Sequence, residues 1–124
     1  MSADVLLDTH TFLWWDAGKL PSAVVRRIQS AGDVFVSAAS AWEIAIKASL
    51  GKIEARAAMA DAIADYGFLP LSISLEHGDA VRGLPHHHRD PFDRMLIAQA
   101  RVEGLAIVSR DELLSAYDVE IVWD

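Results

Sequence analysis

The chain of 124 residues contains no cysteine. This absence excludes a disulfide framework and any metal site built from thiolates, and it gives no sign of an oxidising compartment. No apolar run approaches the roughly 18 residues that a membrane span requires. No basic segment precedes the first apolar run, as one would in a secretory signal peptide. We therefore expect a cytoplasmic protein that does not enter a membrane.

Positive charge is also scarce. The chain has 11 Lys plus Arg against 18 Asp plus Glu, a net charge of −7. Such a chain has no overall attraction for nucleic acid, which is a polyanion. Composition alone therefore argues against a nucleic-acid partner. The 52% hydrophobic content excludes disorder, and the length fits a single domain over residues 1–124.

Short apolar runs alternate with helical patterns along the whole chain. The predicted strands are residues 5–7, 34–36, 68–73, 105–108 and 119–122. The predicted helices are residues 9–18, 23–30, 38–50, 56–66, 75–84 and 91–103, with a short one after residue 111. This alternation is typical of an α/β domain with a mostly parallel sheet, in which ligands bind beyond the carboxyl ends of the strands. The helix over 38–50 is apolar nearly all round, which predicts burial on most faces.

Four acids occupy positions of interest in this pattern. Asp8 follows the first strand, and Asp111 comes just after the strand that ends at residue 108. Asp93 lies in the first turn of a helix, and Glu43 lies inside the apolar one. Each has an ordinary explanation: the three aspartates can cap helices, and Glu43 can pair with Lys47. Together in apolar surroundings, however, carboxylates are costly unless a cation joins them, and such oxygen ligands suit Mg²⁺ or Mn²⁺.

Four segments of the chain resemble the motifs of PIN-domain ribonucleases. They are residues 5–15, 37–47, 88–100 and 108–111, in the family's order and spread over essentially the whole chain. The closest group is the VapC-type toxins of bacterial toxin–antitoxin pairs. The resemblance implies a PIN-like α/β/α sandwich and an endoribonuclease that depends on Mg²⁺ or Mn²⁺. It also implies a VapB-like antitoxin as partner and a homodimer.

The resemblance assigns roles to particular residues. The catalytic and metal-binding quartet would be Asp8, Glu43, Asp93 and Asp111. Asp8 would be the main metal ligand, Asp93 and Asp111 would bind the ion directly or through water, and Glu43 would hold or orient metal-bound water. A metal-activated water would attack the scissile phosphate of RNA, leaving a 5′-phosphate and a 3′-hydroxyl. If these acids repel one another without metal, replacing Asp8 by Asn should raise folding stability.

Contacts to RNA are expected beside the quartet. The run of three histidines at residues 86–88 is predicted to be a surface loop, whose imidazoles contact phosphates together with Arg89. The proposed substrate-binding residues are Ser109, Arg89, Arg94, Arg110 and His88. These groups and a bound ion would reverse the local charge, so we expect poor RNA binding without metal. For His10, both a position in the wall of the site and one on the helix surface remain open.

Two other functions fit parts of the sequence. A protein-interaction module with a lost nuclease activity would need no metal, although the intact quartet argues against it. A haloacid-dehalogenase-like phosphatase would use Asp8 as nucleophile, but that motif requires a second Asp where this chain has His10. Trp14 and Trp15 are expected in the core, and the early helices offer an apolar surface for an antitoxin segment.

Overall fold

A parallel five-stranded sheet forms the centre of the computed structural model, which describes residues 3–54 and 58–124. The strand order is β3-β2-β1-β4-β5. The strands are β1 (Val5–Leu7), β2 (Val34–Ser37), β3 (Leu69–Leu71), β4 (Ala106–Val108) and β5 (Ile121–Val122). The predicted α/β class is confirmed, and every strand pairing is parallel. Pro70 is tolerated in β3 because β3 is an edge strand.

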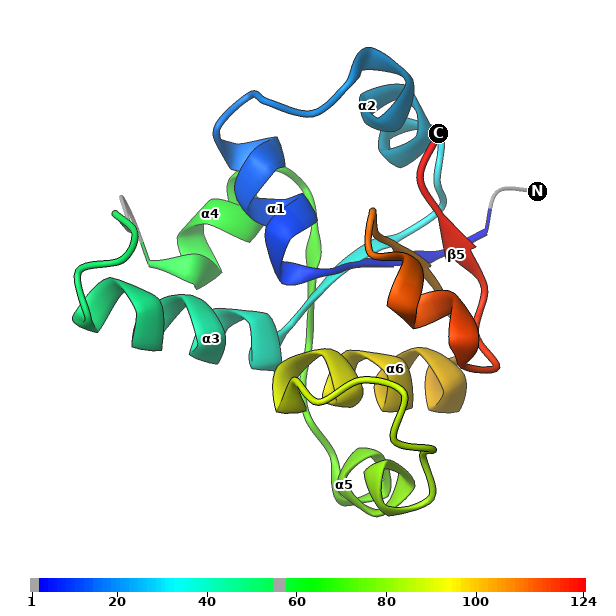
Figure 1. Cartoon of the computed structure of the whole chain (residues 1–124). Helices are drawn as coiled ribbons and strands as arrows, with labels where there is room; N and C mark the ends of the chain where they lie inside the picture. Colours follow the sequence, from blue (N-terminus) through cyan, green and yellow to red (C-terminus); the bar gives the residue numbers. More distant parts are fainter. Residues whose placement is uncertain (1–2, 55–57) are drawn as a thin grey trace.

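Helices cover both faces of this sheet. They are α1 (Thr9–Asp16), α2 (Ser22–Gln29), α3 (Ala38–Ser49), α4 (Met59–Asp65), α5 (Leu75–Arg82) and α6 (Pro91–Glu103), with the 3₁₀ helix η1 (Glu112–Ala116). Figure 1 shows α1 and α2 on one side of the sheet and α5 and α6 on the other. The arrangement is therefore an α/β/α sandwich. No helix in the described ranges is long and apolar enough to cross a membrane.

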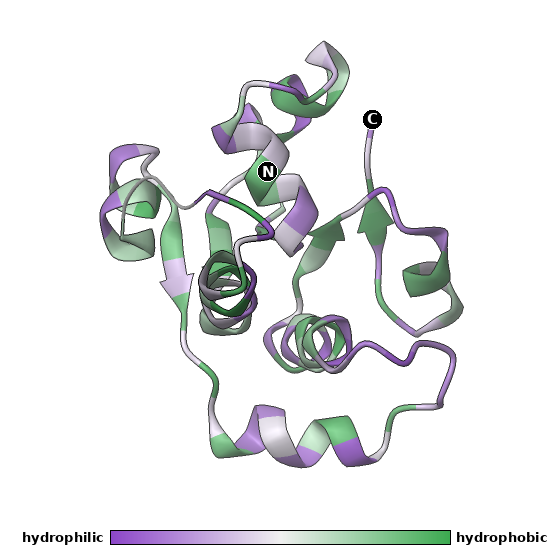
Figure 2. Cartoon of the chain, turned by 60° about the vertical axis from the view of Figure 1, so that its left-hand side comes forward, coloured by the Kyte–Doolittle hydropathy of each residue, from purple (hydrophilic) through white to green (hydrophobic). Residues whose placement is uncertain are grey.

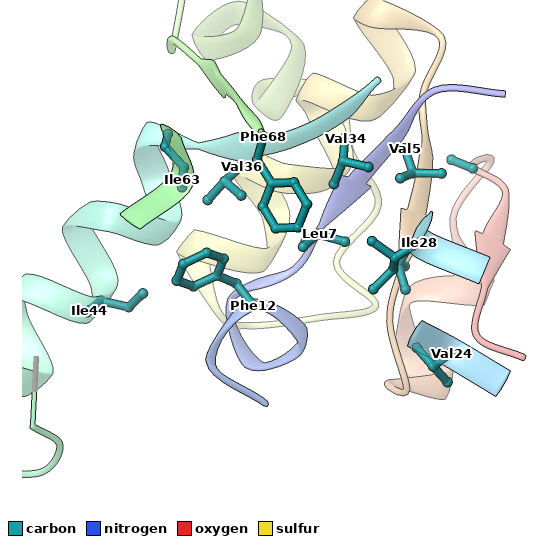
Figure 3. Packing of buried hydrophobic residues seen from close by; sticks show 12 residues of the cluster. Val5, Leu7, Phe12, Val24, Ile28, Val34, Val36, Ile44, Ile63 and Phe68 are labelled. Atoms are coloured by element: carbon teal, nitrogen blue, oxygen red, sulfur yellow. The ribbon is translucent and has the colours of Figure 1, made fainter. Parts of the chain in front are cut away.

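The two cores follow from the alternation of side chains along the strands. Leu7 and Val36 pack with Phe12 of α1 and residues of α2 and α4, as Figure 3 shows. Leu6 points the opposite way and packs with Leu96 and other residues of α6. Both faces of the central strands are buried, which explains why these strands are continuous apolar runs, drawn in green in Figure 2.

Capping residues fix where the helices begin. The side chain of Asp8 accepts a hydrogen bond from the Thr11 amide and caps α1. Ser37 caps α3, and Asp90 caps α6 ahead of Pro91. These three helices therefore start directly at, or close to, the carboxyl ends of strands.

The prediction that the helix over 38–50 is buried on most faces is wrong. In α3, Trp42 is 60% exposed and Leu50 is 63% exposed, whereas Glu43 is 4% exposed. The helix contacts β2, α1 and α6, and its buried residues are Ala39, Ser40, Glu43 and Ile44. The predicted helix over 56–66 is shorter in the structure, beginning at Met59; residues 56 and 57 lie outside the described residues.

Candidate metal centre

The topology brings the predicted acids to one edge of the sheet. Strand β1 lies between β2 and β4, and Leu7 is level with Val36 and Val108 in the two neighbours. The residues that follow, Asp8 and Ser109 among them, therefore leave the sheet side by side. From β1 the chain builds the sheet outward through β2 and β3 on one side, and it later adds β4 and β5 on the other side of β1. Such a reversal of strand order is where α/β sheets bind ligands. Helices α1, α3 and α6 begin close together here (Figure 1).

Asp8 is buried, and protein donors serve both of its carboxylate oxygens. Its Oδ1 accepts from the Thr11 amide at 2.8 Å, and its Oδ2 accepts from the Ser109 hydroxyl at 2.5 Å. The same Ser109 oxygen accepts from the Asp111 amide at 3.0 Å. Ser109 thus links the acid after β1 to the acid after β4 and fixes how they face each other.

Asp93 and Asp111 share a third neighbour, His88. The Nε2 atom of His88 lies 3.1 Å from Asp93 Oδ2 and 3.1 Å from Asp111 Oδ2. One ligand atom from each of the three residues lies within 4.8 Å of the others. The Nδ1 atom of His88 accepts from the Asp90 amide at 3.1 Å. In the neutral ring this bond places the proton on Nε2, so that the imidazole donates to the carboxylates.

The carboxyl group of Asp93 holds its proton far more tightly than usual. Burial is the largest cause, and together with the negative charges of Asp90, Asp8 and Glu43, and against the opposing effect of His88, it raises the pKa of Asp93 from 3.8 to about 7. A neighbouring positive charge would favour the ionised form. Near neutral pH, the charge of Asp93 therefore depends on whether a cation is present.

Glu43 leaves one buried oxygen without a partner. Its Oε2 accepts from Lys47 Nζ at 2.8 Å, as the sequence spacing suggested, but its Oε1 has no hydrogen-bond partner among the described residues. A buried carboxylate oxygen without a donor or cation is costly. The ligand atoms that lie together are those of His88, Asp93 and Asp111, and the charge of Glu43 acts on Asp93 as well. Carboxylate oxygens of this kind are the hard donors that Mg²⁺ or Mn²⁺ prefers.

The comparison with protein families decides where the chain belongs. A family model described as the PIN domain matches residues 5–120. The chain belongs to the PIN-domain family. Members of this family are nucleases that generally use a divalent metal ion, which agrees with the donor set at the sheet edge. No curated protein matches the chain. The match leaves the phosphatase alternative without support.

Solved structures share this PIN fold. One similar chain comes from a toxin–antitoxin complex of Klebsiella pneumoniae, with 15% identity, 95% of each chain covered and a TM-score of 0.68. Another comes from a crystal structure of DNA-bound VapBC from Salmonella typhimurium, with 18% identity, 98% of each chain covered and a TM-score of 0.66. At these identities the likeness establishes the fold.

The guanidinium of Arg94 is used in hydrogen bonds within the protein. It is buried, and its guanidinium donates to carbonyl oxygens of the segment just before α6. The acceptors are the carbonyls of Pro85 at 2.8 Å, Val81 at 3.3 Å and Leu84 at 3.3 Å. With these donors used, Arg94 holds the loop that carries His88, and we leave it out of the proposed RNA contacts.

The other charged residues considered near the site are at the surface. Arg89 and Arg110 are exposed, so their side chains are accessible to a substrate. His10 is exposed too and lies against Trp14, with ring centroids 5.9 Å apart. His10 therefore lies on the exposed surface of α1, two residues after Asp8.

Sequence reasoning missed the close contact of His88 with two acids. Only one signal pointed to it: His88 stands two residues before Asp90, the N-cap of α6, at a spacing that lets its ring accept from the Asp90 amide. It also missed the aromatic pair formed by the exposed Trp42 and the half-buried Phe92, whose ring centroids lie 5.0 Å apart. Each member of this pair immediately precedes an acid of the quartet.

Proposed function

We propose that this PIN domain is a metal-dependent endoribonuclease, with the quartet Asp8, Glu43, Asp93 and Asp111 as its catalytic and metal-binding residues. The observation that carries the proposal is the unpartnered buried oxygen of Glu43 beside the crowded carboxyl group of Asp93. Lys47 contacts one oxygen of Glu43 and His88 contacts Asp93, but these groups compensate the charges only in part. A divalent ion would compensate them, and the residues present fit Mg²⁺ or Mn²⁺.

Each side chain has a distinct task in this proposal. Asp93, Asp111 and Asp8 would hold the ion, and Ser109 keeps Asp8 oriented through its hydroxyl. Glu43 would orient a water molecule through its free oxygen. When bound, the ion would activate water for attack on the scissile phosphate and stabilise the negative charge that develops there.

The test is RNA cleavage with Mg²⁺ or Mn²⁺, with EDTA, and with substituted chains. Asp8→Asn and Glu43→Gln should each lower the cleavage rate on the order of a hundredfold or more. Asp118→Asn is the matched control, because this exposed acid precedes β5 at the opposite edge of the sheet. Equal cleavage by all chains, or cleavage that persists in EDTA, would reject the metal–carboxylate mechanism.

We also propose that the protein is the toxin of a toxin–antitoxin pair, with an antitoxin protein as partner, and that it works in the cytoplasm as a homodimer. The similar chains from Klebsiella pneumoniae and Salmonella typhimurium both come from such complexes. A short reading frame next to this gene should encode the partner. Its product should co-purify with the chain and suppress RNA cleavage; a product that does neither would remove the antitoxin assignment.

A further inference from the structure

Trp42 is exposed at a place where its neighbour is deeply buried. The side chain of Trp42 is 60% exposed, while that of Glu43 is 4% exposed. The edge of one ring packs against the face of the other in the Trp42–Phe92 pair, at 5.0 Å between centroids and 76° between planes. Phe92 in turn precedes Asp93. The start of α6 therefore braces the indole, which presents its free surface to solvent immediately beside the candidate metal centre.

Two hollows lie at this aromatic pair, one bordered by His88 and the other by Glu43. The larger, of about 760 Å³, is lined by Trp42, Phe92 and His88, among others. The smaller, of about 390 Å³, is lined by Phe92 and Glu43, among others. Because His88 contacts two of the acids and Glu43 is itself one, a molecule lying across Trp42 and Phe92 would be continuous with the centre.

The charge around the smaller hollow differs from that of the chain. Lys47, Lys52 and Arg89 line it, together with the acids Glu43 and Asp90. Positive side chains thus outnumber negative ones here, in a chain with a net charge of −7. Proteins that bind single-stranded nucleic acid combine such a cationic groove with aromatic rings on which bases stack.

We propose that Trp42 is the stacking platform for one unpaired base of a single-stranded RNA substrate. The inference rests on the proposed ribonuclease activity and specifies its substrate class. The phosphates on either side of that base lie toward Lys47, Lys52 and Arg89, and the chain then enters the metal centre past Glu43. A duplex is excluded from this position because its bases are already stacked on one another.

A second copy of this chain is the competing occupant. Trp42, Ile46 and Leu50 are exposed at a spacing of four residues along α3 and form an apolar stripe. A protein partner would use the whole stripe and would gain nothing from the cations beside it. Stacking of a base needs the aromatic ring at position 42 alone. The two occupants therefore predict different effects of substitutions at positions 42 and 50.

The experiment measures KM and kcat for cleavage of a single-stranded RNA of about 15 nucleotides, near the upper site size of single-strand binding folds. Trp42→Leu keeps an apolar side chain but removes the ring, and it should raise KM about five- to a hundredfold, with little change in kcat. The KM of Trp42→Phe should stay within about threefold of that of the unsubstituted chain, because a phenyl ring can still stack on a base. Leu50→Ala is the comparison for the apolar stripe, since Leu50 is about as exposed as Trp42. Leu50 borders the smaller hollow but has no ring on which a base can stack, so Leu50→Ala should raise KM less than about threefold. The same RNA annealed to its complement should bind more weakly and should not respond to Trp42→Leu.

Unchanged KM in Trp42→Leu would overturn the inference. A second result would also overturn it: light scattering shows that Trp42→Leu and Leu50→Ala lose the dimer equally, while their affinity for RNA is unchanged. That result would assign the stripe to a second copy of the chain. Circular dichroism checks that each chain folds. If the unsubstituted chain cleaves RNA and Asp8→Asn does not, the ribonuclease proposal stands whatever Trp42→Leu does. If no chain cleaves RNA, the ribonuclease proposal fails, and the stacking role of Trp42 fails with it.

Discussion

Asp8 and Asp93 lie at the same edge of the sheet but in opposite circumstances. Asp8 is buried with a donor on each oxygen, from the Thr11 amide and the Ser109 hydroxyl. Asp93 has other acids around it, and burial with their repulsion raises its pKa to about 7. The protein compensates the charge of Asp8 with its own groups but leaves that of Asp93 largely uncompensated. The edge therefore combines a part that supports the fold with a part whose ionisation costs stability until a cation arrives.

The largest expected effect on folding stability comes from the ionisation of Asp93. Because the pKa of Asp93 is about 7 in the folded chain and 3.8 as the ordinary value, the folded state binds an extra proton between these pH values. The metal-free protein should therefore lose stability as pH rises from about 4 to about 7. Asp93→Asn removes that cost and should stabilise the metal-free protein by about 2–4 kcal/mol at pH 8, with no effect near pH 3.5. Urea unfolding at both pH values measures this.

Asp8→Asn is the paired substitution, and here the structure changes the expectation from sequence. Repulsion among the acids suggested that this variant would be more stable. An asparagine at position 8 can still cap α1, but it loses the charge-assisted hydrogen bond from the Ser109 hydroxyl, so we now expect Asp8→Asn to lose about 1 kcal/mol at pH 8. Equal stabilisation by both variants would mean that the two aspartates do not differ as described.

The next effect concerns metal affinity and pH. Binding of a cation must displace the proton from Asp93, whose pKa is about 7. Affinity for Mn²⁺ should rise about tenfold per pH unit between pH 5 and 6.5 and level off above about 7.5. Titration calorimetry in buffers of different ionisation enthalpy would show both the slope and the released proton. Asp93→Asn should flatten the slope, and an unchanged slope would place the titrating group elsewhere.

A smaller effect is expected from Ser109→Ala. This change removes the donor to the buried Asp8 Oδ2 and the acceptor for the Asp111 amide. Loss of a hydrogen bond to a buried charged group should cost about 1–3 kcal/mol, at the low end if water enters the space. Thermal unfolding measures the cost. Ser115→Ala is a suitable control, because Ser115 is exposed and its hydroxyl bonds only within η1. Equal small shifts in both variants would deny Ser109 its linking role.

The sequence was sufficient to predict the sheet and the edge at which the candidate site lies. Apolar runs located the strands, and parallel pairing placed Asp8 and Asp111 at the same edge, since both follow strands. The burial of α3 was not predictable, because a helix that is apolar all round does not show which face the sheet and α6 will cover. Packing turned Glu43 inward and left Trp42 outside.

Loop conformation set a second limit. Any of three consecutive histidines could have approached the acids, and the choice of His88 depends on the carbonyls of residues 81–85 that Arg94 binds. Those contacts join segments about ten residues apart through a buried guanidinium. No local sequence pattern predicts such a contact, because nothing in the neighbouring residues distinguishes Arg94 from an exposed arginine on a helix.

The smallest expected change in stability comes from Asp111→Asn. Asp111 caps η1 through Oδ1, and its side chain is 36% exposed. Asparagine caps as well as aspartate, and water screens the charge that is lost, so stability should change by less than about 0.5 kcal/mol. Affinity for Mn²⁺ should nevertheless fall roughly tenfold or more, because a proposed ligand is gone. Thermal unfolding and calorimetry on the same sample separate the two quantities. Unchanged metal affinity would remove Asp111 from the ligand set and leave Asp93 and Glu43 to supply the uncompensated charge at this edge.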